Sequence, residues 1–130
     1  MFKFERLDVW RKSVEFAALV YTVSRAFPDS ERFGITSQIR RSAVSISANV
    51  AEGSSRVSDK DFSRFLEIAY GSLSETISHI SVTRRLGFVS DSDSAGVQDA
   101  AEELARMLTG LRNTLGSWTN VREQRPGSTG

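Results

Sequence analysis

Apolar residues recur at helical spacing from the first residues of the chain onward. The first such segment begins near Asp8, an acceptable N-cap residue, and its apolar stripe is wide for a helix that faces one neighbour. Its two rows consist of Trp10, Val14, Ala17 and Tyr21, and of Phe16, Leu19, Val20 and Val23. A second helix is predicted from about Thr36 to Gly53, which is a plausible end. Its larger side chains share one face: Ile39, Ala43, Ile46 and Val50.

Two longer helices are predicted in the second half of the chain. Ser58 followed by Asp61 resembles a capping box and opens the third helix, which runs to about Leu86, with Gly87 as its C-cap. Its apolar residues are Phe62, Leu66, Ala69, Leu73, Ile77 and Ile80. After a polar turn over residues 90–93, the fourth helix alternates apolar steps of four and three, the period of a coiled-coil seam. These positions are Val97, Ala101, Leu104, Leu108, Leu111, Leu115 and Trp118.

The breaks between these segments are short and indicate an all-α fold. Pro28 and Pro126 are the only prolines, and each stands where a helical pattern stops. The sequence contains no alternation of apolar and polar residues long enough to predict a β-strand. Because short connections make neighbouring helices antiparallel, we predict an up-down four-helix bundle over residues 1–122. Residues 123–130 have little to bury, and we expect a disordered tail there.

Composition excludes several classes of chemistry. The 130 residues fit one domain, with 39% hydrophobic residues and a net charge of +1. The chain contains no cysteine and one histidine. This composition excludes disulfides, thiolate metal sites and any site that needs two imidazoles. We expect neither a signal peptide nor a membrane span, and therefore a cytoplasmic location.

Catalytic motifs are equally scarce. A di-iron bundle needs Glu-x-x-His motifs on two helices, whereas the chain offers only His79, with Glu75 four residues before it. Neither a phosphate-binding Gly-x-x-x-x-Gly-Lys loop nor a Gly-x-Ser-x-Gly elbow occurs. We therefore expect a protein that is not an enzyme and that uses neither cofactor nor metal.

The second helix carries more apolar surface than one partner can cover. Val44, Ala48 and Ala51 form a strip roughly opposite the main apolar face of that helix. Such a strip is either the interface of a homo-oligomer or a scatter of alanines chosen for helix propensity. We favour the interface, because the broad apolar stripe of the first helix also exceeds the needs of a monomer.

Three stretches, residues 38–53, 58–62 and 65–75, resemble the 23S rRNA intervening-sequence proteins, also labelled the S23 ribosomal protein family. Shorter matches, such as Leu7-Val9-Trp10 and Leu86-Gly87, extend the resemblance to about Arg112. The resemblance implies an up-down bundle that assembles as a ring-like homopentamer. The accessory protein of diversity-generating retroelements, which is similar to this family, forms a pentameric barrel and binds reverse transcriptase and nucleic acid.

One polar cluster stands out near the end of the second helix. Asn49 and Glu52 are neighbours on one side of this helix, next to Gly53, and a carboxylate at a helix C-terminus opposes the helix dipole. Its compensation is expected from Arg41 of a neighbouring subunit, from Arg56 in the following turn, or from backbone amides. We interpret the cluster as a structural clasp for the turn, with ligand binding as the alternative.

Basic residues are mildly enriched in the first half of the chain. Residues 1–64 hold 11 Lys and Arg against 8 Asp and Glu, a balance of +3, and the remainder hold 6 against 8, a balance of −2. Candidate nucleic-acid contacts, which an oligomer would multiply into a basic stripe, are Arg11, Lys12, Arg40, Arg56, Lys60 and Arg64. The alternative is that these charges pair with nearby carboxylates. The sequence thus leaves two functions open, binding of RNA or ribonucleoprotein, and a structural or protein-interaction module without nucleic-acid affinity.

Overall fold

The computed structural model describes the backbone of residues 1–123 and the side chains of residues 1–116. Four α-helices form the fold: α1 (Asp8–Ser24), α2 (Ile35–Ser54), α3 (Asp59–Arg85) and α4 (Asp91–Glu123). Two short 3-10 helices precede α1 and α2, namely η1 (Lys3–Arg6) and η2 (Asp29–Glu31). Residues 1–123 contain no strand. Residue 123 of the predicted tail ends α4, and the rest of that tail lies outside the described part of the chain. The side chain of Trp118 also lies outside it.

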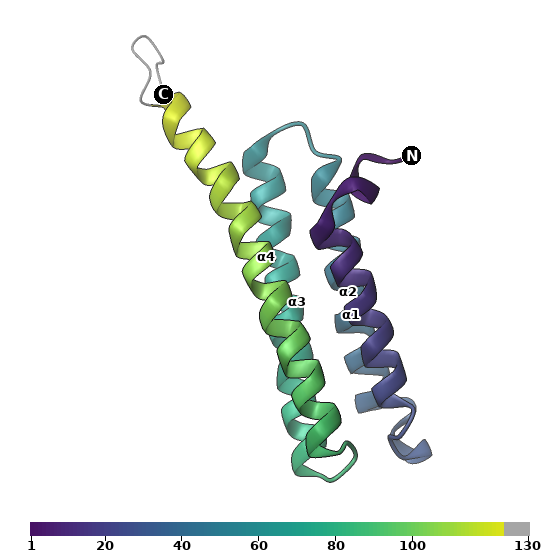
Figure 1. The fold of residues 1–130 in the computed structure, drawn as a ribbon. Helices are drawn as coiled ribbons and strands as arrows, with labels where there is room; N and C mark the ends of the chain where they lie inside the picture. Colours follow the sequence, from purple (N-terminus) through teal and green to yellow (C-terminus); the bar gives the residue numbers. More distant parts are fainter. Residues whose placement is uncertain (124–130) are drawn as a thin grey trace.

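The four helices run up and down in a bundle, as the sequence predicts (Figure 1). Each helix packs on the helices next to it in the chain, and α4 returns to pack on α1. The contact between α2 and α3 is the most extensive of these. Figure 1 shows α1 and α2 on one side of the bundle and α3 and α4 on the other.

The two ends of α3 follow local sequence rules. The Ser58 hydroxyl accepts a hydrogen bond from the Asp61 amide at 3.1 Å, which confirms the predicted N-cap. At the other end Gly87 has φ 79°, a left-handed conformation that favours glycine. The Phe88 amide donates to the Thr83 carbonyl at 2.9 Å and the Gly87 amide to that of Arg84 at 3.0 Å, which closes a Schellman motif.

Three predicted boundaries are wrong by a few residues. Gly53 does not end α2, which continues to Ser54, because Gly53 is buried against α3. Residues 91–93 of the predicted polar turn already belong to α4, since the Ser90 hydroxyl accepts from the Asp93 amide at 3.0 Å. Asp8 is the first residue of α1 rather than its cap.

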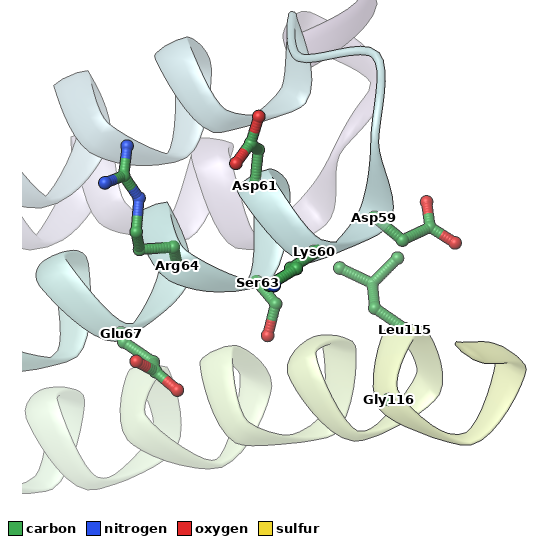
Figure 2. A pocket seen from close by; sticks show the side chains of 8 residues that line it. All are labelled: Asp59, Lys60, Asp61, Ser63, Arg64, Glu67, Leu115 and Gly116. Carbon is green, nitrogen blue, oxygen red and sulfur yellow. The ribbon is translucent and has the colours of Figure 1, made fainter. Parts of the chain in front are cut away.

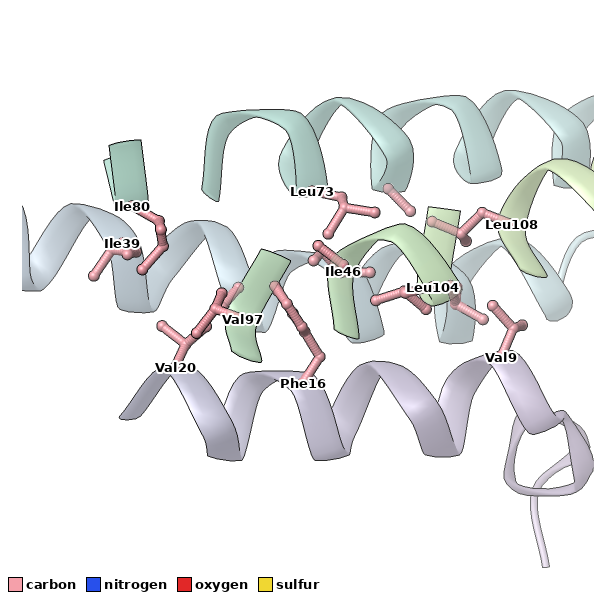
Figure 3. Packing of buried hydrophobic residues seen from close by; sticks show 14 of the residues in the cluster. Val9, Phe16, Val20, Ile39, Ile46, Leu73, Ile80, Val97, Leu104 and Leu108 are labelled. Atoms are coloured by element: carbon pink, nitrogen blue, oxygen red, sulfur yellow. The ribbon is translucent and has the colours of Figure 1, made fainter. Parts of the chain in front are cut away.

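A single apolar core lies along the bundle axis (Figure 3). The four large residues predicted for α2 are all fully buried, as are Leu104 and Val97 on α4. On α1 the core contains Val9 and, from the second of the two rows, Phe16, Val20 and Val23. Val14 and Tyr21 of the first row remain 41% and 42% exposed. The wide stripe of α1 therefore divides into a core face and an outer face.

Hydroxyl groups connect α2 and α3 within this core. The Ser42 and Thr76 hydroxyls lie 2.8 Å apart, and both side chains are buried. By contrast, the buried Thr36 hydroxyl, near the start of α2, has no hydrogen-bond partner within the described residues. A buried hydroxyl without a partner costs about 1–3 kcal/mol, whereas a bonded one contributes.

We therefore expect Thr36→Val to raise the stability of the protein. Valine has nearly the same shape as threonine but buries no unsatisfied oxygen, so the gain should be about 1 kcal/mol in the free energy of unfolding. Thr76→Val is the matched control and should lower the stability, because it removes the contact between the Thr76 and Ser42 hydroxyls that links α3 to α2. Thermal unfolding followed by circular dichroism compares the two variants, and equal effects would contradict the assignment.

None of the helices within residues 1–123 has the length and apolar character that crossing a bilayer requires.

Candidate functional site

The polar cluster predicted around Asn49 divides into two separate contacts. The Asn49 amide donates to the backbone carbonyl and the hydroxyl of Ser45, one turn earlier, at 2.8 Å and 3.0 Å. The Ser45 hydroxyl in turn lies 2.9 Å from that of Ser72 on α3. Asn49 thus extends the row of hydroxyl contacts between α2 and α3, and the structure records no bond from it to Glu52.

Glu52 bonds instead to the turn that follows its helix. The Arg56 guanidinium donates to the Glu52 carboxylate at 2.8 Å, one of the three compensations that the sequence suggested. The Glu52 side chain is 54% exposed. A surface pair of this kind contributes about 0–1 kcal/mol, so Glu52 is not part of a buried polar network. Arg41, in the first half of α2, is also exposed. Together with Glu75 of α3 it lines a polar groove.

Gly53 has the closest contact in the cluster. A Cβ atom at this position would lie 2.6 Å from the Phe65 Cβ and 3.0 Å from the Phe62 ring. The glycine therefore sets how closely the C-terminal end of α2 approaches the start of α3. Together with Asn49 it supports the structural interpretation of this part of the chain.

The predicted nucleic-acid residues do not form one stripe on the single chain. Lys12 links α1 to α4, with its amine 3.0 Å from the Glu103 carboxylate. Arg40 links α2 to α1, since its Nε donates to the Ser24 hydroxyl at 2.8 Å and its guanidinium lies 4.7 Å from the Tyr21 ring centroid. Arg11 pairs with Asp8 within its own helix at 3.3 Å. These three side chains are therefore engaged in contacts within the bundle.

The other three basic residues gather at the turn between α2 and α3. The Arg56 and Arg64 guanidiniums lie 4.8 Å and 5.5 Å from the centroid of the same Phe65 ring. Lys60 lies one turn before Arg64 on α3. The open pocket beside them, between α3 and α4, also holds carboxylates (Figure 2). These acidic residues are Asp59, Asp61 and Glu67. The local charge is thus mixed rather than strongly basic.

An exposed apolar surface covers the seam between α1 and α2. We call it the α1–α2 face and define it by Val14 and Tyr21 of α1 and by Val44 and Ala48 of α2. Val44 is 43% exposed and Ala48 is exposed. Ala51, the third residue of the predicted strip, is half-buried and lines a groove beside Phe2 and Phe4 of the N-terminal segment. The N-terminal segment thus covers part of the predicted strip, which the sequence did not predict.

The register of α1 against α2 places these exposed residues at matching levels of the bundle. The contact between Arg40 and Tyr21 places these two residues at one level of the bundle. The helices are antiparallel. By their rise, Val14, two turns before Tyr21, therefore lies near the level of Ser47 and Ala48, which are two turns after Arg40. Val44 lies between the two levels. Sequence spacing places these residues on their own helices, but only the packed pair joins them.

Groups suited to catalysis or to metal binding are sparse in the described part of the chain. Residues 1–116 contain no group of three His, Asp or Glu side chains that could hold a metal ion. The His79 Nε2 is buried without a hydrogen bond, and the nearest recorded carboxylate, that of Glu75, is 3.7 Å away. This distance is too long for a hydrogen bond of normal strength.

The chain matches a known protein family over most of its length. The family model of the 23S rRNA-intervening sequence protein matches residues 5–110. A solved structure from Bacteroides thetaiotaomicron, described as a protein with unknown function from the S23 ribosomal protein family, is 26% identical with a TM-score of 0.74. The match covers 80% of this chain and 97% of that one. No curated protein matches the chain.

Proposed function

This chain belongs to the 23S rRNA-intervening sequence protein family, and we propose that it is a non-catalytic, homo-oligomeric interaction module. The α1–α2 face carries this proposal. Four exposed side chains, three of them large, lie on the two packed helices α1 and α2. Exposed apolar residues that gather on one side of a small protein favour an interaction site.

The surroundings of the face support a protein interface. Arg40 and Arg41 border the apolar residues on α2, and Arg25 lies one turn beyond Tyr21 on α1. An apolar centre with a charged border is the usual anatomy of a protein–protein interface. The small side chain of Ala48 at the centre allows a partner to approach closely.

Light scattering of the purified full chain tests the proposal. A homo-oligomer should give a mass several times 14.4 kDa, with the pentamer as the value that the family resemblance implies. A mass of one chain at every concentration would remove the proposed function.

Binding of RNA is a second candidate, and Lys60 and Arg64 favour it. Both side chains are exposed on adjacent turns of α3, and neither has an ion pair within the described residues. Arg64 is also held against the Phe65 ring, next to Arg56. A ring of subunits would repeat this cationic pair and so create a field that one chain lacks.

If the oligomer binds RNA, we expect contacts mainly to phosphate and therefore a strong dependence on salt. Each neutralised phosphate releases counterions, so the logarithm of the affinity should fall linearly with the logarithm of the salt concentration. Filter binding between about 50 and 200 mM salt measures this slope.

Lys60→Gln should reduce the slope, because it removes one cation from every subunit. Arg85→Gln is the matched control: Arg85 is exposed at the other end of α3, and its replacement should leave the slope unchanged. Failure to retain RNA at the lowest salt would eliminate this candidate and leave the protein-interaction module.

A further inference from the structure

A polar groove lies between α2 and α3. We call it the α2–α3 groove and define it by the residues that line it: Gln38, Arg41, Ser42 and Ser45 of α2 and Glu75 of α3. The residues of α2 follow the spacing i, i+3, i+4 and i+7, which places them on one side of that helix. The groove has a volume of about 320 Å³, at the small end of ligand pockets.

The two serines of the groove belong to fixed contacts between α2 and α3. The buried Ser42 hydroxyl lies 2.8 Å from that of Thr76, and the Ser45 hydroxyl lies 2.9 Å from that of Ser72. Glu75 lies between Thr76 and Ser72 in the sequence of α3. These contacts set the register of the two helices at the groove. A site on packed helices holds its side chains more precisely than a site on a loop.

Two charges of opposite sign line the groove without neutralising each other. The Arg41 guanidinium forms no ion pair with a described residue. The Glu75 carboxylate is 60% exposed and lies 3.7 Å from the His79 Nε2, which is charged only when the imidazole is protonated. Arg56 and Arg84, by contrast, pair with carboxylates at 2.8 Å and 2.9 Å. The groove therefore keeps a cation and an anion available to a ligand.

Gln38 adds an amide, which can both donate and accept hydrogen bonds. Its side chain is exposed and lines the groove with the two charges. All five lining side chains are polar, so the groove offers an apolar group or a nucleobase no surface to pack on. The lining thus favours a small ligand that is polar and charged.

We propose that the α2–α3 groove binds a small zwitterion, a molecule that carries a carboxylate and an ammonium group, as a free amino acid does. The Arg41 guanidinium holds the carboxylate, because its planar donors match the two oxygens of that group. The Glu75 carboxylate holds the ammonium group. A ligand with one charge leaves the other side chain unpaired, so the groove favours the zwitterion. The site belongs to one chain and does not depend on the oligomeric state.

Calorimetric titration of the full chain tests this site. The probes are the twenty common amino acids, titrated one at a time, with acetate and methylammonium as ligands that carry one charge each. At least one amino acid should bind with a Kd of about 1 mM or tighter, and acetate and methylammonium about tenfold or more weakly than it. Glycylglycine distinguishes the two sources of such a zwitterion, a free amino acid and the two ends of a short peptide.

Arg41→Gln and Glu75→Gln should each lower the affinity for the bound zwitterion by about tenfold or more, because each removes one recognised charge. Arg85→Gln and Glu102→Gln are the matched controls, since both residues are exposed and lie outside the groove. The double variant Arg41→Glu with Glu75→Arg presents the same two charges from exchanged positions. It should regain binding, which a merely structural role of the two residues does not explain.

Two results would overturn the site: amino acids and glycylglycine that bind no more tightly than acetate, or a Glu75→Gln variant that keeps the full affinity. Because Arg41 also borders the α1–α2 face, light scattering accompanies each titration. Should Arg41→Gln change the mass, Glu75→Gln on α3 decides. A monomeric protein that binds the zwitterion would overturn the proposed function and leave this site standing.

Discussion

Gly53→Ala is expected to lower the stability of the bundle by about 2 kcal/mol or more in the free energy of unfolding. The new methyl group would lie 2.6 Å from the Phe65 Cβ, a distance that real Cβ atoms do not show. Because both atoms are attached to the backbone of packed helices, α2 and α3 must move apart at this end. Overpacking of a core costs about 1–3 kcal/mol and occasionally more.

Gly71→Ala provides the matched comparison on α3. A Cβ atom at Gly71 would have no neighbour within 4 Å, and alanine favours a helix interior over glycine by about 1 kcal/mol. This variant should therefore unfold at a higher temperature than the unmodified protein, and Gly53→Ala at a temperature about 5–10 °C lower. Both melting curves are to be recorded at the same protein concentration, because assembly contributes to stability. A stabilised Gly53→Ala variant would show that the helices are not in close contact there.

Ala48→Glu is expected to dissociate the homo-oligomer into single chains. Ala48 is exposed in the single chain, so the fold should tolerate the substitution. In the proposed interface the same carboxylate would be buried without a partner, at a cost of several kcal/mol. Since 1.4 kcal/mol corresponds to a factor of ten, the affinity between subunits should fall by about a hundredfold or more.

Ala95→Glu controls for the added charge. Ala95 is exposed in the first turns of α4, away from the α1–α2 face, and a carboxylate near a helix N-terminus is well tolerated. Its mass by light scattering should equal that of the unmodified protein. If Ala48→Glu also keeps that mass, the α1–α2 face is not the interface, whatever the oligomeric state.

The fold could be predicted from the sequence alone, because the helices follow from local rules and from one period. The spacing of Ile39, Ile46 and Val50 required a buried face on α2, and Ser58 and Gly87 fixed the ends of α3. It also supplied the family resemblance, which the match over residues 5–110 confirmed.

Local rules were less reliable where packing competes with them. A glycine near the end of a helical pattern usually ends the helix, yet Gly53 lies inside α2 because Phe65 needs the space that a side chain would occupy. The choice among the three partners suggested for Glu52 could not be made from the sequence for a related reason. Spacing shows which residues share a helix face, but not that Arg56 reaches back from the turn and holds the carboxylate at the surface.

Contacts between residues of different helices could not be predicted from the sequence, because they depend on how the helices pack. The α1–α2 face needs the register between two antiparallel helices, which the contact of Arg40 with Tyr21 fixes. A pocket between α3 and α4 is lined by both Tyr70 and Ala105, which are thirty-five positions apart in the chain. The ion pair between Lys12 and Glu103 likewise forms only because α4 packs on α1. A sequence pattern reports the periodicity of one helix, whereas a binding surface arises from the packing of several, and that packing is a property of the whole fold.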